Sequence, residues 1–184
     1  MHSLHKILVH IPDLPLKPNT CSKKELISEI RSYAEEETSS DRMDIYDRRE
    51  TDSAGHWAAQ YPVNVLFAKD NVERFIQELI AVRDYQHHEI QDTLHKLSKK
   101  TGTDLQQITC EIEKMNHQYE ITETVDPMTA FYLSKIASLL DGQYTFHSCF
   151  YNILGGTSMV YPQNIEAIQK NPEDWALVLF DCHH

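Results

Sequence analysis

The sequence lacks any apolar run long enough to cross a membrane, because a membrane-spanning helix needs about 20 consecutive apolar residues. Its longest runs, WALVLF at 175–180 and KILVHI at 6–11, have the length of single strands. A cationic N-terminal flank followed by a long apolar stretch, as in a secretory signal, is also missing. We therefore expect a cytoplasmic protein that does not bind a membrane.

Closely spaced cysteines are lacking as well. None of the four lies within a CxxC spacing of another, which argues against the paired ligands of a classical zinc finger. Disulfide frameworks are typical of short secreted chains, so these thiols are expected to be reduced and buried. The four are Cys21, Cys110, Cys149 and Cys182.

The sequence also lacks the short motifs of common nucleotide-binding and hydrolytic enzymes. The stretch GGTS at 155–158 has neither the lysine nor the spacing of a phosphate-binding P-loop, and no GxSxG sequence occurs. Basic residues interleaved with aromatic ones, which are typical of nucleic-acid-binding proteins, are not found. The sequence therefore contains no complete motif that would identify a reaction.

Negative charge predominates, and the net charge is −11 at pH 7. Such a field repels phosphate backbones and attracts basic protein surfaces, so we expect no direct binding of nucleic acid. Residues 101–130 hold six acids against one lysine, and residues 31–60 hold eight acids against four arginines. The eight are our candidate binding residues: Glu35, Glu36, Glu37, Asp41, Asp44, Asp47, Glu50 and Asp52.

Apolar residues at both ends of the chain predict the centre of a β-sheet. In the expected strands at 5–11 and 175–182 both faces are apolar, which is typical of strands covered on both sides. Two such strands are natural neighbours in one sheet. We expect one α+β domain over residues 1–184, with a mixed or antiparallel sheet, the N- and C-terminal strands central, and three to five helices packed against it.

Capping residues and apolar stripes predict where the helices lie. Ser22 and Glu25 form a capping-box pattern, which predicts a helix start. The longest helix is expected at about 71–100, closed by Gly102. Others are expected from Thr103 onward, within 125–142 and at 162–170.

Two irregular segments separate these elements. Residues 37–60 carry dense mixed charge and are expected to form a long acidic loop, with a short strand at 43–47. The pair Gly155-Gly156, between apolar stretches, predicts a β-hairpin with strands in 143–154 and 157–161. His147 and Cys149 would then share one face of a strand, where we expect a core thiol rather than a nucleophile.

The sequence closes with Asp181, Cys182, His183 and His184 directly after the terminal apolar run. If the strand continues, Asp181 and His183 share one side of it, since side chains alternate along a strand. They could supply two metal ligands, or a catalytic base and the group that orients it. An adjacent N-terminal strand could add one of three histidines: His2, His5 or His10. The alternative, which the sequence favours, is a solvated chain end.

The longest expected helix carries a second candidate metal site. His88, Asp92 and His95 share a helical face, and two imidazoles with a carboxylate can hold a transition metal. An ordinary polar face is the favoured alternative. Earlier in the helix, Arg83 and His87 interrupt the apolar stripe. The helix either projects past the core there, or breaks, or places these two side chains in a polar cleft that binds an acidic group.

Two functions from different classes follow. In the first, the protein is a non-enzymatic acidic interaction module, for example an inhibitor that mimics nucleic acid and occupies the basic surface of a partner protein. In the second, it is a small metal-dependent hydrolase that uses a His/Asp site with zinc or manganese. The first, which needs no cofactor, is slightly favoured because no catalytic motif is complete. A homodimer could complete the packing of the interrupted helix.

Overall fold

The computed structural model describes residues 2–15, 22–39, 48–50, 53–101 and 127–183. They divide into two units. The sheet unit consists of Met1–Arg83 with Tyr144–His184, and the helical unit consists of Asp84–Gln143. Each is described separately below, and the expectation of one domain stays a prediction.

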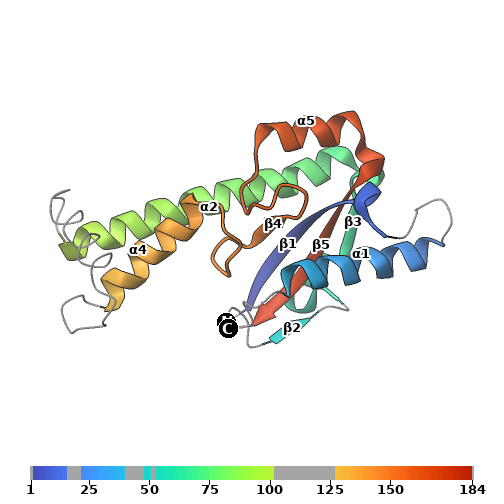
Figure 1. The fold of residues 1–184 in the computed structure, drawn as a ribbon. Coiled ribbons are helices and arrows are strands. Elements are labelled where there is room, and N and C mark those ends of the chain that lie inside the picture. Colours follow the sequence, from blue (N-terminus) through green and yellow to red (C-terminus); the bar gives the residue numbers. More distant parts are fainter. Residues whose placement is uncertain (1, 16–21, 40–47, 51–52, 102–126, 184) are drawn as a thin grey trace. The chain divides into compact units, whose positions relative to one another are not determined.

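The two ends of the chain form the centre of the sheet unit (Figure 1). Strand β1 (His2–His10) pairs antiparallel with β5 (Trp175–His183) along the whole length of both strands. The register places His2 opposite His183 and His10 opposite Trp175. The prediction that the terminal strands are central neighbours is therefore confirmed.

Among the described residues, three short strands complete a mixed sheet of five strands. β4 (Phe150–Asn152) pairs parallel with β1, while β2 (Arg48–Glu50) and β3 (Val65–Phe67) both pair antiparallel with β5. The order is β2-β5-β1-β4, with β3 beside β5 as well. The α+β class and the mixed sheet are thus confirmed.

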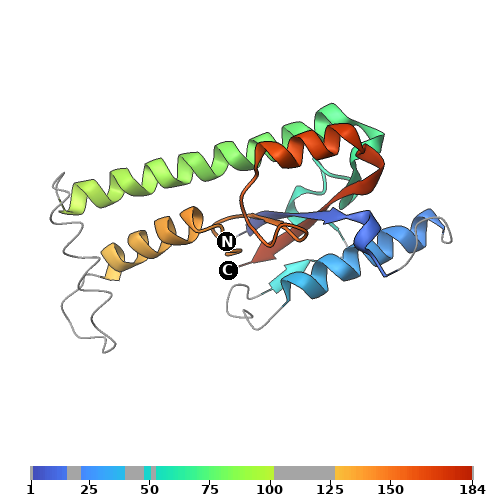
Figure 2. The same ribbon diagram turned by 45° about the horizontal axis from the view of Figure 1, so that its top comes forward.

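Helices of the sheet unit cover both faces of the central strands (Figure 2). α1 (Lys23–Thr38) packs on one face, whereas α5 (Pro162–Lys170) and the first half of α2 (Val72–Thr101) pack on the other. Alternate residues of β5 accordingly enter two separate cores. On the α1 side lie Val178, Phe180 and Cys182, and on the other side lie Trp175, Leu177 and Leu179. Both sets are buried, which explains the unbroken apolar run.

The start of α1 is capped as the sequence predicts. The Ser22 hydroxyl accepts the backbone N–H of Glu25 at 3.3 Å, and the Glu25 carboxylate accepts the N–H of Ser22 at 2.7 Å. The backbone amide and hydroxyl of Ser22 lower the pKa of Glu25, because both donate to its charged form.

We expect Ser22→Ala to lower the free energy of unfolding by about 1 kcal/mol, because it removes the side-chain acceptor at the helix start. Ser28→Ala is the matched control, since Ser28 is an exposed serine inside the same helix. It should be neutral or slightly stabilising, because alanine is the better helix former. Urea denaturation of both variants would measure the difference. Equal effects would show that the cap contributes nothing.

α2 is a single uninterrupted helix of 30 residues that passes from the sheet unit into the helical unit between Arg83 and Asp84. This boundary lies in the interval where the apolar stripe is interrupted. The helix does not break there, and Arg83 and His87 are both exposed, which favours projection past the core; the polar cleft stays a prediction. The helix leaves the core of the sheet unit at this point.

The helical unit also contains α4 (Pro127–Leu140), at the place where a helix was expected. The Lys135 ammonium donates to the Glu89 carboxylate, which ties α4 to α2 within this unit. The helix expected from Thr103 lies outside the described residues. Over the part of the chain that the structure describes, no helix has the length and apolar character needed to span a membrane.

The expected hairpin around Gly155-Gly156 is largely wrong. Only an isolated bridge between Asn152 and Thr157 joins its two sides, and His147 and Cys149 precede β4 in a turn instead of sharing a strand face. β4 pairs in parallel with β1 over its three residues. Within this turn Gly156 has a positive φ, 58°, a conformation that favours glycine.

In the segment expected to be a long loop, residues 37–60, the structure describes the end of α1, strand β2 and a short 3₁₀ helix. The strand expected at 43–47 lies outside the described residues. Within the described ranges of the chain, the 3₁₀ helices are η1 (Ile11–Asp13), η4 (Gly55–Trp57), η5 (Ala68–Asp70) and η6 (Pro172–Asp174).

Candidate metal centre

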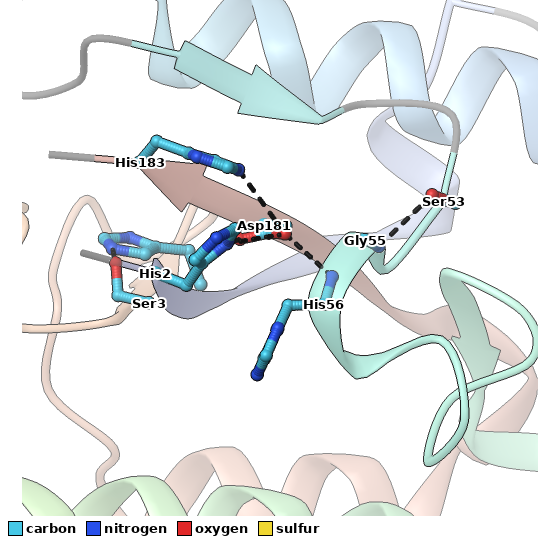
Figure 3. Close-up of polar contacts among 8 residues, drawn as sticks. His2, Ser3, Ser53, Gly55, His56, Asp181 and His183 are labelled. Atoms are coloured by element: carbon cyan, nitrogen blue, oxygen red, sulfur yellow. Dashed lines mark hydrogen bonds and ion pairs between the residues drawn. The ribbon is translucent and has the colours of Figure 1, made fainter.

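Three polar side chains meet at the end of the sheet where β1 begins and β5 ends (Figure 3). The pairing register places His2 directly opposite His183, so their side chains lie on the same side of the sheet. Asp181 precedes His183 by two residues in β5 and therefore projects from that side too. Register and alternation together create the cluster from residues that are 181 positions apart in sequence.

The atoms of this cluster are close enough to share one ion. Nδ1 of His2 lies 3.0 Å from Oδ1 and 3.1 Å from Oδ2 of Asp181. Nε2 of His183 lies 3.6 Å from Oδ2 of Asp181. One ligand atom from each residue lies within 4.8 Å of the other two. The two imidazole rings are 3.9 Å apart between centroids.

Asp181 is the buried member of the cluster. Its exposed fraction is 1%, whereas the His2 and His183 side chains are exposed to 42% and 29%. The backbone N–H of His56 donates to Oδ2 of Asp181 at 2.8 Å. Burial disfavours the charged carboxylate, but this amide bond and the His2 imidazole outweigh burial and lower the pKa of Asp181. The carboxylate is therefore ionised at neutral pH.

This arrangement matches the ligand chemistry of zinc or a similar divalent metal ion. Zn²⁺ bonds to histidine nitrogen and carboxylate oxygen at about 2.0–2.2 Å, so tetrahedral ligand atoms are separated by about 3.4 Å. The separations between the Asp181 carboxylate and the two imidazoles, 3.0–3.6 Å, bracket that value. Two imidazoles and one carboxylate also leave positions free for water or substrate, as in catalytic zinc sites and other metalloenzymes.

Of the three histidines considered as a third ligand, only His2 joins Asp181 and His183. His5 is buried on the opposite side of β1, where its Nδ1 lies 3.0 Å from the Tyr144 hydroxyl. His10 is at the far end of the strand, and its Nδ1 lies 2.9 Å from a carboxylate oxygen of Asp13. His184 lies outside the described residues.

The candidate site on α2 is not assembled in the same way. His88, Asp92 and His95 are all exposed, and they do not form a group of the kind seen at His2. Nδ1 of His88 lies 2.7 Å from the Asp84 carbonyl oxygen. The hydrogen bond from Lys96, at 2.5 Å, lowers the pKa of Asp92. A metal site there stays a prediction that this geometry does not support.

The structure describes the remaining predicted binding residues only in part, and their role in binding stays a prediction. Glu35, Glu36 and Glu37 are exposed near the end of α1. The Glu50 backbone is paired opposite Asp181, while Asp41, Asp44, Asp47 and Asp52 lie outside the described residues. Arg83 and His87 are exposed on α2, and Nε2 of His87 lies 2.9 Å from the amide nitrogen of Gln91.

The sequence did not predict that the turn at Gly55–Trp57 contacts the cluster of His2, Asp181 and His183. The His56 amide bonds Asp181, and the His56 ring stacks on His2 with 4.9 Å between centroids. The only available signal was a lone glycine followed by His-Trp inside a charged segment. Such a signal does not say which strand the turn will contact.

Comparison with known proteins supplies no family for this chain: no family model matches it, and neither curated proteins nor solved structures contain a similar protein at the significance required.

Proposed function

We propose that the protein binds one divalent transition-metal ion, zinc or manganese, through His2, Asp181 and His183, and that it is a small metal-dependent hydrolase. The supporting observation is the convergence of three ligand atoms within 4.8 Å at the end of the sheet. Three protein ligands leave a coordination position open. A metal ion held there would lower the pKa of a bound water molecule, so that hydroxide would be available at neutral pH to attack an ester or phosphoester.

Burial of the carboxylate adds to the argument. A charged group that is 1% exposed needs partners, and the His56 amide alone does not neutralise its charge. Either a protonated imidazole or a metal ion can do so. The exposed fractions of His2 and His183 leave a route from solvent to the ion.

The experiment is elemental analysis and metal titration of the untagged protein. We expect about one Zn²⁺ or Mn²⁺ per chain and loss of binding in His183→Ala. His88→Ala is the matched control, because it removes an exposed histidine of the alternative site on α2. Binding that is lost in His88→Ala and kept in His183→Ala would place the ion on α2. No binding by the native protein would refute the proposal.

Hydrolysis is tested separately with p-nitrophenyl acetate and bis(p-nitrophenyl) phosphate. Activity should require the added metal and be lost in His183→Ala. Metal binding without turnover of either compound would support a metal-binding protein and contradict the proposed hydrolase activity.

A second candidate is an acidic interaction module that contacts a basic partner protein. Its support is the exposure of Glu35, Glu36 and Glu37 on successive positions of α1. Electrostatic association of this kind weakens as salt rises. A complex with a basic protein whose affinity did not change between low and high salt would argue against this candidate.

A further inference from the structure

The backbone of Gly55, at the start of η4, lies so close to Asp181 that no residue with a Cβ atom would fit there. A Cβ atom at Gly55 would lie 2.2 Å from Oδ2, 2.6 Å from Cβ and 2.8 Å from Cγ of Asp181. All three separations are shorter than side-chain atoms tolerate. Gly55 also has φ +51°, a conformation that favours glycine. The close approach therefore requires glycine at position 55.

This approach brings a backbone donor to the carboxylate. The next residue, His56, directs its N–H at Oδ2 of Asp181, at 2.8 Å (Figure 3). A hydrogen bond to a charged acceptor is short and strong, and it restricts rotation of the carboxylate about its terminal bond. The same group faces His2 and His183 with the geometry given above.

The turn itself is held firmly. The Gly55 N–H donates to the Ser53 hydroxyl at 3.1 Å, and the Trp57 N–H donates to the Ala54 carbonyl at 3.0 Å. Ala54 is buried in the core on the α2 side, and Trp57 packs against that core. The position of the His56 amide is thus fixed by hydrogen bonds within the turn and by the burial of Ala54, in addition to the contacts of the turn with His2 and Asp181.

We infer that Gly55 and the backbone amide of His56 are the outer shell of the metal site, and that they set its affinity by holding Asp181 in the orientation that faces both imidazoles. This inference rests on the proposed function, since it assigns positioning residues to the same ion. Outer-shell partners that orient a ligand typically change metal affinity 10–100-fold when they are lost. Gly55 and the His56 amide contact Asp181, so they are positioning residues and not metal ligands.

The test uses two glycines that share a backbone conformation. Gly55→Ala and Gly156→Ala both place alanine at positive φ, +51° and +58°, but a Cβ at Gly156 would have no atom within 4 Å. Each variant would be titrated with Co²⁺ and followed by visible absorption, which reports both affinity and coordination. The thermal unfolding temperature of each variant would also be measured.

We expect Gly156→Ala to bind Co²⁺ as the native protein does. Gly55→Ala should bind about 10–100-fold more weakly, with an altered spectrum at saturation, because its carboxylate is displaced. Lower stability alone would not change the spectrum of the saturated site. Native affinity and a native spectrum in Gly55→Ala, or equal losses in the two variants, would overturn the inference.

A milder variant covers the case in which Gly55→Ala does not fold. Ser53→Ala removes the hydroxyl that anchors the Gly55 amide, and it should weaken Co²⁺ binding roughly fivefold, the equivalent of about one net hydrogen bond. Unchanged binding in Ser53→Ala would then overturn the inference. If the native protein binds no Co²⁺, Zn²⁺ or Mn²⁺, the proposed function itself fails, which is a different outcome from tight native binding with unaffected variants.

Discussion

Lys6→Met is expected to lower the free energy of unfolding by about 3–5 kcal/mol, the usual cost of removing one member of a buried ion pair. Lys6 projects from β1 into the core between the sheet and α2, and its Nζ lies 2.7 Å from Oε2 of Glu78. The two side chains are exposed to only 11% and 14%. Without the ammonium, the Glu78 carboxylate would lose its charged partner in a largely buried site.

Tyr61 forms a hydrogen-bonded network with Lys6 and Glu78, and it allows a second variant to be compared with Lys6→Met. The Tyr61 hydroxyl donates to Oε2 of Glu78 at 2.8 Å. Burial of Tyr61, then this hydrogen bond and the carboxylate charge, raise the pKa of the phenol, so it stays a donor. Lys6→Met combined with Glu78→Gln removes both charges and keeps an acceptor for Tyr61. We therefore expect the double variant to recover most of the loss.

Lys96→Met is the matched control for the buried pair. Lys96 pairs with Asp92 at 2.5 Å on α2, but both side chains are about half exposed. An exposed pair of this kind contributes little, because water and salt screen it. Chemical denaturation of all three variants should show a large loss only for Lys6→Met. Similar losses for Lys6→Met and Lys96→Met would show that burial of the Lys6–Glu78 pair has no special weight.

Asp181→Ala is expected to lower metal affinity by at least about 100-fold, which is the upper end of what loss of an outer-shell partner costs. It removes the only carboxylate of the cluster and leaves two imidazoles from adjacent strands. The metal-free protein should also lose about 1–3 kcal/mol of stability, because the His56 amide loses a buried acceptor. Isothermal titration with Zn²⁺ and thermal unfolding would measure the two effects.

Asp92→Ala serves as the control for Asp181→Ala, because Asp92 is the carboxylate of the other predicted metal site. Its carboxylate is exposed and already paired with Lys96. We expect Zn²⁺ binding to be unchanged in this variant. Zn²⁺ affinity that fell in Asp92→Ala and persisted in Asp181→Ala would refute the placement of the ion on the sheet.

The centre of the fold could be predicted because its sequence signal is local. Runs that are apolar on both faces indicate strands covered on both sides, and only the two ends of the chain carried such runs. The same alternation placed Asp181 and His183 on one side of the last strand. The identity of the third ligand depended on the pairing register, which sequence alone leaves open; three histidines of β1 were equally good candidates.

Other features depended on contacts that a single sequence does not reveal. The hairpin expected at Gly155-Gly156 is reduced to a single bridge, and β4 pairs instead over its length with β1, more than 140 residues earlier in the chain. The Gly55–His56 turn was missed because its role depends on Asp181, at a separation of 125 residues from His56. Similarly, the Lys6–Glu78 pair joins a strand and a helix whose sequences look ordinary.

The pairing of β1 with β5 also has a consequence for synthesis of the chain. Strand β1 is made long before β5 and is apolar on both faces, and its longest ladder cannot form until residues 175–183 have been made. Pairing between such distant segments is slow, and it leaves apolar surface exposed while translation proceeds. A nascent chain stalled before Trp175 should therefore be recognised by chaperones or proteases, whereas a chain that includes β5 should not.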